Sequence, residues 1–186
     1  MNKVDENPLQ RYPEERPLSA DAGKWKVVFL KSRREKHFAS ELKLRAIGYY
    51  LPLYVKRARR KDNGKERKSL LPLFPGYLAF VGGPDSLLKL QDNSDLVSVI
   101  NVVDQSRFVR ELDQIRTILD KNVTLRLHKG MAPGARVKVR SGALQGLEGV
   151  VVHDENESRL VVGIEMFAQS VSVKIDETDL VGLGEP

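Results

Sequence analysis

The sequence predicts an α+β protein in which an N-terminal antiparallel sheet with helices precedes a small C-terminal β-barrel. Between residues 25 and 121, strand and helix patterns follow the order β-α-β-β-α-β, which is typical of a split β-α-β fold. Beyond residue 134 only short strand patterns recur, separated by glycines and turn residues. We expect these strands to close into a barrel, because closure removes exposed sheet edges.

The composition divides the chain into four parts. Residues 1–23 are expected to form a disordered tail, because prolines interrupt any helix there and few large apolar residues are available for burial. The N-terminal domain is expected at 24–122 and the barrel domain at 135–183, joined by a linker at 123–134 that contains two glycines and a proline. A chain of 186 residues, 41% of them hydrophobic, is long enough for two cores.

The first helix of the N-terminal domain is expected to begin with a capping box. Ser32 is followed three residues later by Glu35, the spacing at which both side chains satisfy backbone donors at a helix start. Apolar residues then recur at helical spacing and Gly48 ends the helix. Strands are predicted at 25–31, 49–55, 71–81 and 96–103, and helices at 33–47, 85–91 and 106–121.

The uncharged stretch 71–81, LPLFPGYLAFV, is the most distinctive of the predicted strands. Pro72 and Pro75 lack backbone donors and are therefore placed at the entry of the strand. Gly76 then frees the backbone before the buried run begins. Phe74 and Tyr77 therefore lie at a rigid strand entry.

Positive charge is concentrated in one segment of the chain. Residues 24–68 hold 16 of the 31 Lys and Arg residues but only 4 of the 25 Asp and Glu residues, although the whole chain has a net charge of +6. Such a local excess predicts a surface that faces a polyanion, although a solvated basic face is the alternative. A basic hairpin, KRARRKDNGKERK at 56–68, contributes much of this charge and has a turn signal at its centre.

Two motifs resemble those of a known family. SGALQGLEGVVV at 141–152 is similar to a KOW motif, with spaced glycines before a β-branched strand. Further upstream, WKVV at 25–28 and PLFPGY at 72–77 resemble the N-terminal, or NGN, domain of the NusG family of transcription elongation factors. The resemblance covers residues 24–182 and implies an NGN domain followed by an SH3-like KOW barrel. SRREK at 32–36 and YYLPL at 49–53 are more similar to specialised paralogues, RfaH-like or polysaccharide-operon antiterminators.

The resemblance implies partners and sites. It implies binding to the clamp helices of RNA polymerase, DNA contacts within the elongation complex, and partners such as NusE or the Rho terminator for the KOW domain, where Phe167 stands at the position of an exposed aromatic residue. The polymerase-binding residues implied are Phe29, Phe74, Pro75 and Tyr77. The DNA-binding residues implied are Lys31, Arg34, Lys43 and Arg45, whose cationic side chains can neutralise phosphates.

We expect a transcription elongation and antitermination factor, with a ribosome-associated or RNA-binding KOW protein as the alternative. An enzyme is not expected, because the three histidines have no metal-ligand spacing and neither a nucleophile elbow nor a P-loop is present. No cofactor is expected. The absence of cysteine fits the cytoplasm. No apolar run reaches the roughly 20 residues of a membrane span, so no membrane partner is expected.

Overall fold

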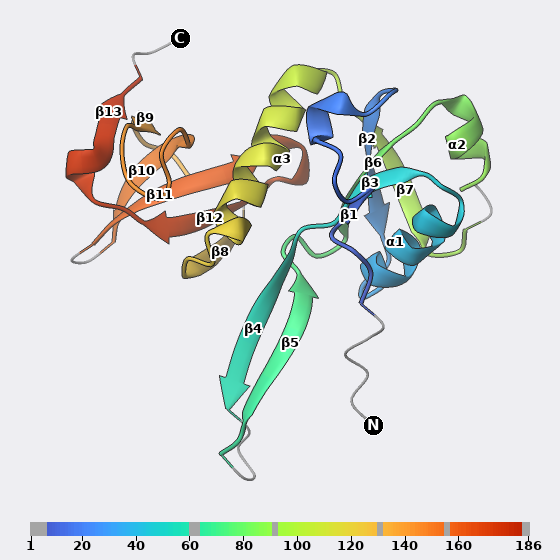
Figure 1. The fold of residues 1–186 in the computed structure, drawn as a ribbon, viewed down its shortest axis with the longest axis horizontal. Helices are drawn as coiled ribbons and strands as arrows, with labels where there is room; N and C mark the ends of the chain where they lie inside the picture. Colours follow the sequence, from blue (N-terminus) through green and yellow to red (C-terminus); the bar gives the residue numbers. More distant parts are fainter. Residues whose placement is uncertain (1–6, 60–63, 91–92, 130–131, 155–156, 184–186) are drawn as a thin grey trace. The chain divides into compact units, whose positions relative to one another are not determined.

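The chain forms two compact units, one ending at Val103 and the other beginning at Asp104 (Figure 1). The structure is a computed structural model, and no helix in its described part is both long and apolar enough to cross a membrane. It describes residues 7–59, 64–90, 93–129, 132–154 and 157–183.

The first unit contains a five-stranded antiparallel sheet in the order β1-β3-β6-β2-β7. Two further strands, β4 and β5, pair with each other and, within the described residues, with no other strand; they form a ribbon that extends from this sheet (Figure 1). The antiparallel sheet with helices predicted for this half of the chain is thereby confirmed. The elements are β1 (Arg11–Tyr12), η1 (Leu18–Ala20), β2 (Trp25–Leu30), α1 (Glu35–Leu44), β3 (Gly48–Tyr50), β4 (Leu53–Arg59), β5 (Glu66–Pro72), β6 (Tyr77–Val81), α2 (Pro84–Leu88) and β7 (Leu96–Asn101).

Prolines set the limits of the strands in this unit. The strand predicted at 49–55 is divided into β3 and β4 around Pro52, and the stretch 71–81 is divided between the end of β5 and β6. The physical reason is that proline removes a ladder hydrogen bond, so regular pairing stops or changes partner there. The core beneath the sheet is formed by Phe38 and Leu42 of α1 and by Phe80 of β6, all fully buried.

The N-terminal segment is ordered where the structure describes it. β1 pairs with β3 at the edge of the sheet, and Leu18 is fully buried. The Arg11 guanidinium lies 5.4 Å from the centre of the Trp25 ring and forms an ion pair with Asp21. The prediction of a disordered tail is therefore wrong for residues 7–23, because contacts with residues distant in the sequence stabilise this segment; the rest of the predicted tail lies outside the described residues.

The start of α1 also differs from the prediction. The helix begins at Glu35, and Arg34 at the N-cap position makes no side-chain cap hydrogen bond. The predicted capping box of Ser32 and Glu35 is therefore wrong. The Glu35 carboxylate instead accepts a hydrogen bond from the backbone N–H of Gly76, at 2.7 Å.

The second unit contains a six-stranded antiparallel sheet in the order β13-β9-β10-β11-β12-β8. Within the described residues no pairing joins β13 to β8, so the sheet is open. The strand β8 falls inside the predicted linker at 123–134, which is a correction: these residues continue the ladder of β12. The elements are α3 (Gln105–Asp120), β8 (Leu125–Lys129), β9 (Arg136–Val139), β10 (Glu148–Asp154), β11 (Glu157–Ile164), η2 (Glu165–Phe167), β12 (Gln169–Lys174), η3 (Glu177–Asp179) and β13 (Leu180–Gly182).

Gly149, within the glycine-rich stretch at 141–152, is required by a close backbone approach. A Cβ atom at this position would lie 2.3 Å from the carbonyl oxygen of Val161 on β11. No side chain fits at that distance, so any other residue would push β10 and β11 apart. The spacing of glycines in this stretch therefore reflects strand packing as well as turns.

Helix α3 belongs to the second unit, whereas the sequence pattern places it in the N-terminal domain. It begins at the N-cap Asp104, whose side chain accepts a hydrogen bond from the N–H of Arg107, at 2.9 Å. Its apolar face buries Phe108, Leu112, Ile115 and Ile118. The side chain of Gln114 accepts a hydrogen bond from the N–H of Glu148 on β10, at 2.6 Å. These contacts account for the grouping of α3 with the second sheet.

Candidate functional site

An aromatic pair forms the most distinctive surface feature of the first unit. Phe29 on β2 and Tyr77 on β6 lie directly opposite each other in the antiparallel ladder. Their ring centroids are 5.1 Å apart, and the ring planes are tilted by 44°. Phe29 is 36% exposed and Tyr77 is half-buried, so both rings present area to solvent. Such rigid aromatic area is typical of protein interfaces, because little side-chain entropy is lost when it is buried.

Gly76 brings the backbone against this pair. Its φ of +86° lies in the left-handed region, and a Cβ atom there would lie 2.9 Å from Cε2 of Phe29. The carbonyl oxygen of Gly76 accepts a hydrogen bond from the N–H of Leu30, at 2.8 Å. Together with the bond from its own N–H to the buried Glu35 carboxylate, this fixes the turn on both sides. The aromatic pair is therefore pre-organised by backbone contacts.

Phe74 and Pro75 occupy different environments. Pro75 is exposed at the turn, next to the aromatic pair. Phe74 is only 2% exposed, and its ring lies in the core. The expectation that Phe74 is an anchor for a partner is therefore corrected: a ring with so little accessible surface offers almost no area to a partner. The exposed candidate surface consists of Phe29, Pro75 and Tyr77, and we call it the aromatic surface.

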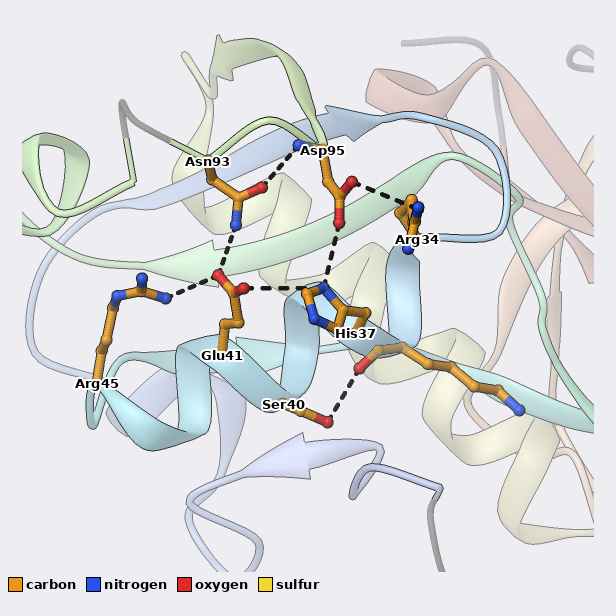
Figure 2. Close-up of polar contacts among 8 residues, drawn as sticks. Arg34, His37, Ser40, Glu41, Arg45, Asn93 and Asp95 are labelled. Carbon is orange, nitrogen blue, oxygen red and sulfur yellow. Dashed lines mark hydrogen bonds and ion pairs between the residues drawn. The ribbon is translucent and has the colours of Figure 1, made fainter. Parts of the chain in front are cut away.

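Helix α1 carries a network of alternating charges (Figure 2). Arg34 forms an ion pair with Asp95, with 3.4 Å between Nε and Oδ1. Arg45 forms an ion pair with Glu41, with 2.8 Å between Nη1 and Oε2. His37 lies between the two carboxylates, with its Nδ1 atom 3.1 Å from Asp95 and 3.8 Å from Glu41. The network therefore joins the two arginines through acidic partners.

Two residues outside α1 hold this network in place. The Asn93 side-chain amide donates a hydrogen bond to Glu41, and its carbonyl oxygen accepts one from the N–H of Asp95, at 2.8 Å (Figure 2). Asp95 is 7% exposed, so its charge lies close to the protein interior. Sequence reasoning missed Asn93 and Asp95, because they precede β7 and lie far from α1 in the sequence.

The four predicted DNA-binding side chains differ in their neighbours. Lys31, Arg34, Lys43 and Arg45 are all exposed. Both arginines are engaged by carboxylates, whereas no ion pair of Lys31 or Lys43 is found in the described part of the chain. Lys31 and Lys43 are therefore the members of the set whose charge is least compensated.

Phe167 is buried in the second unit. It is 1% exposed, and its ring meets that of Phe108 on α3 edge to face, with 6.0 Å between centroids. The expectation of an exposed aromatic residue at this position is therefore corrected: α3 covers the ring.

A buried carboxylate accompanies that contact. Glu111 of α3 accepts a hydrogen bond from the N–H of Glu165, at 3.2 Å, and pairs with Arg107, at 3.1 Å. Burial is the larger influence and raises the pKa of the Glu111 carboxyl, although the hydrogen bond and the arginine oppose this rise. The contact between α3 and η2 therefore involves a carboxyl group that titrates.

The described residues contain no group of three or more His, Asp or Glu side chains arranged to hold a metal ion. The features that stand out are an aromatic surface, exposed cations and buried supporting contacts. Apolar area and exposed cations are typical of surfaces that bind macromolecules.

A family model matches residues 23–125, more than half of the chain, and its description is "Transcription termination factor nusG". The match contains the aromatic surface and the α1 network. A search among curated proteins finds no significant relative.

Two solved structures show weaker similarity. The structure titled "Domain interaction in Thermotoga maritima NusG" has 19% identity and a TM-score of 0.46, covering 84% of this chain and 95% of that one. The structure titled "Crystal Structure of MjSpt4:Spt5 complex conformation B" has 10% identity and a TM-score of 0.29, covering 87% of this chain and 97% of that one. Since both TM-scores are below 0.5, the family assignment rests on the sequence model.

Proposed function

The chain belongs to the NusG family of transcription factors, and we propose that it is an elongation factor that binds RNA polymerase and nearby DNA to suppress pausing or termination. The observation that carries this proposal is the pre-organised aromatic surface of Phe29, Pro75 and Tyr77, which lies within the family match. We assign this surface to the clamp helices of the polymerase, with Phe74 supporting it from the core.

The aromatic surface is suited to this role because its geometry is fixed before binding. Backbone hydrogen bonds and the close approach of Gly76 hold the Phe29 ring in place. A partner therefore gains apolar burial without an additional cost of ordering these side chains. Anchors of this kind commonly contribute about 2 kcal/mol or more to an interface.

We propose that DNA is contacted by the exposed basic residues around α1. Lys31 and Lys43 are the principal candidates, because phosphate binding there does not compete with an internal ion pair. Arg34 and Arg45 contribute if phosphate replaces Asp95 and Glu41 as their partner. The binding free energy gained from each arginine is smaller, since its guanidinium must exchange one anionic partner for another.

The effect on transcription requires a difference in affinity between polymerase states. A factor shifts the equilibrium between paused and elongating polymerase only by the ratio of its affinities for the two. Simultaneous contact with the clamp helices and with DNA favours the closed, elongating state. No covalent step is involved, so the proposed activity is binding alone.

For the second unit we propose an SH3-like KOW domain, built on the open sheet described above, and the partner that the resemblance implies. The candidates are NusE and Rho, with Phe167 as the anchor after release from α3. We also propose a cytoplasmic, specialised paralogue of the RfaH type. Polymerase occupancy across the genome tests this last point: binding confined to a few long operons supports it, and binding at most transcribed genes contradicts it.

The proposed function is tested by transcription through a pause site with purified RNA polymerase. The wild-type chain is expected to shorten the pause, and Tyr77→Ala to lose most of this effect, because the ring paired with Phe29 is removed. Val103→Ala is a matched control, since Val103 is 95% exposed and lies outside the aromatic surface. The proposal is overturned if the wild type leaves pausing unchanged or if Tyr77→Ala acts like the control.

A further inference from the structure

The second unit contains a hollow between α3 and its six-stranded sheet. Helix α3 lies against the sheet, where the side chain of Gln114 accepts the hydrogen bond from the N–H of Glu148 on β10 (Figure 1). The hollow has a volume of about 450 Å³ and is lined by α3 on one side and by β9, β10 and β11 on the other. This volume lies in the range of small-molecule sites in proteins, which is about 300–1,000 Å³.

Three arginines line this hollow, and two of them have no acidic partner at ion-pair distance. Arg107 pairs with Glu111, at 3.1 Å, and with Glu165. Arg110 on α3 and Arg136 on β9 are exposed, and no ion pair of either is found in the described part of the chain. The site therefore presents two guanidinium groups that are open to an external anion.

Both acidic side chains found in the lining have partners of their own. Glu148 pairs with Lys138, at 3.0 Å. Glu111 has the partners given above, and burial raises the pKa of its carboxyl group. Hydrogen bonding is the main cause that lowers the pKa of Asp104 at the start of α3, and the charge of Arg110 contributes less. The lining therefore carries cationic groups beyond those that its carboxylates neutralise.

The two unpaired guanidinium groups come from different walls of the hollow. Arg107 and Arg110 are three positions apart, so they share one face of α3. Arg136 lies opposite Val150 in the ladder and Val150 lies opposite Val161, so these residues form a row on one face of the sheet. The hollow therefore combines an apolar floor, Val150 and Val161, with one unpaired cation from the helix and one from the sheet.

We propose that this hollow binds a phosphate monoester, with Arg110 and Arg136 on the phosphate and the apolar floor against the organic group. A phosphate monoester carries a charge of about −1.5 to −2 at pH 7 and has three strong acceptor oxygens. Each guanidinium can donate two parallel hydrogen bonds to such oxygens, so two unpaired guanidinium groups suit one dianion. A carboxylate has a single charge and two oxygens, which one guanidinium satisfies.

The hollow has room for more than a phosphate group. Its floor is formed by Val161, which is buried, and Val150, which is half-buried, and the lining includes Gly149 and Gly163, which have no side chains to occupy the space. An organic ring placed on this floor is stabilised by apolar burial. Mononucleotides combine such a ring with a dianionic phosphate, and they are the class of ester that we assign to the site.

This inference goes beyond the proposed function, because the site lies in the second unit and needs neither polymerase nor DNA. The internal phosphates of nucleic acids are diesters with one negative charge each, so they suit the pair of guanidinium groups less well. Inorganic phosphate has the required charge but no organic group for the floor. The test therefore compares these sources of phosphate directly.

The affinity of the full chain is measured for a nucleoside 5′-monophosphate, the unphosphorylated nucleoside and inorganic phosphate, by titration followed in the NMR spectrum. The monophosphate is expected to bind most tightly, and the nucleoside at least about tenfold more weakly, because hydrogen bonds to a charged group are lost. A single-stranded oligonucleotide that contains only diester phosphates is expected not to displace the monophosphate.

Arg110→Gln and Arg136→Gln are each expected to weaken binding of the monophosphate at least about tenfold. The Lys variants at the same positions keep the charge but lose the paired donors, so a smaller loss is expected. Arg116→Gln is the matched control, because Arg116 is on the same helix, pairs with Asp113 and is not among the described residues that line the hollow.

The proposal is overturned if the monophosphate does not bind, if either Gln variant at Arg110 or Arg136 binds it like the control, or if the nucleoside binds as tightly. Equal affinity for inorganic phosphate would also overturn it, because the floor would then contribute nothing. Displacement by the oligonucleotide would show a general nucleic-acid surface instead. Unchanged thermal unfolding of the variants shows that lost affinity is not lost folding.

Discussion

Gly76 is the residue on which the geometry of the aromatic surface depends. Its positive φ turns the chain between Pro75 and Tyr77, and its missing side chain leaves room for the Phe29 ring. The buried Glu35 carboxylate holds the turn through the Gly76 N–H. Gly76 and Glu35, which are distant in the sequence, therefore fix the position of one exposed ring, and a change at either alters the surface without removing an aromatic residue.

Gly76→Ala is expected to destabilise the chain by about 1–2 kcal/mol, because a Cβ atom is unfavourable at positive φ, and to displace Phe29. The measurement is the free energy of unfolding from denaturant titration, together with the exposure of Phe29. Gly83→Ala is the matched control, since nothing lies within 4 Å of a Cβ atom at that exposed position. Equal stabilities of the two variants would contradict the assigned role of Gly76.

Burial of the Glu111 carboxyl group makes the stability of the chain depend on pH. Because burial raises its pKa in the folded state, the carboxyl contributes stability that is present below its ordinary pKa and is lost as pH rises through the raised value. Glu111→Gln removes this term while keeping the shape of the side chain. The wild type is therefore expected to gain stability relative to the variant as pH falls from neutral toward the ordinary carboxyl range.

The measurement is the difference in free energy of unfolding between the two proteins as a function of pH, so that other carboxylates cancel. A difference that is independent of pH, or that changes in the opposite direction, would show that Glu111 is not buried against η2. Asp113→Asn on the same helix serves as a comparison, because the side chain of Asp113 is 38% exposed.

Among the elements, the N-terminal segment adds most to what the sequence pattern predicted. It extends the sheet through β1 and covers Trp25, whose indole N–H donates to the carbonyl of Leu18, at 3.2 Å. Leu18→Ala is expected to destabilise the chain by about 2–5 kcal/mol, because it opens a cavity at a fully buried position. The midpoint of denaturant unfolding checks this, and a midpoint equal to the wild type would mean that the segment does not pack on the sheet.

The regular elements of the chain were predictable from hydrophobic periodicity and from the positions of proline and glycine. The strands β2 and β7 and the helix α3 coincide with predicted segments within a few residues, because their hydrophobic patterns are regular. The charge excess also predicted the basic ribbon, although its residues 60–63, including Arg60 and Lys61, lie outside the described part of the chain.

What the sequence pattern did not predict depends on contacts between distant residues. β1 is a strand because an edge of β3 is available, and no local pattern reveals that edge. Glu35 has the spacing of a cap residue, yet it serves a turn 41 positions away. The burial of Phe74 and Phe167 was missed for the same reason. Neither residue lies in an α-helix or a strand, so no hydrophobic periodicity predicts whether its side chain is buried.

For the whole molecule, the first unit carries the features on which the proposed function depends. Its aromatic surface is assigned to a protein partner and the exposed cations around α1 to DNA in the elongation complex. The two surfaces use different physical terms, apolar burial and charge. Salt therefore separates them, since raised ionic strength weakens the phosphate contacts far more than the aromatic contact.

The most direct test of the central claim is the dissociation constant between the full chain and purified RNA polymerase, measured for the wild type, Tyr77→Ala and the control Val103→Ala. Loss of an anchor worth about 1.4 kcal/mol or more corresponds to at least about a tenfold weaker complex, which is expected for Tyr77→Ala alone. An affinity of Tyr77→Ala equal to that of the wild type, in a chain that is shown to be folded, would contradict the assignment of the aromatic surface to the polymerase.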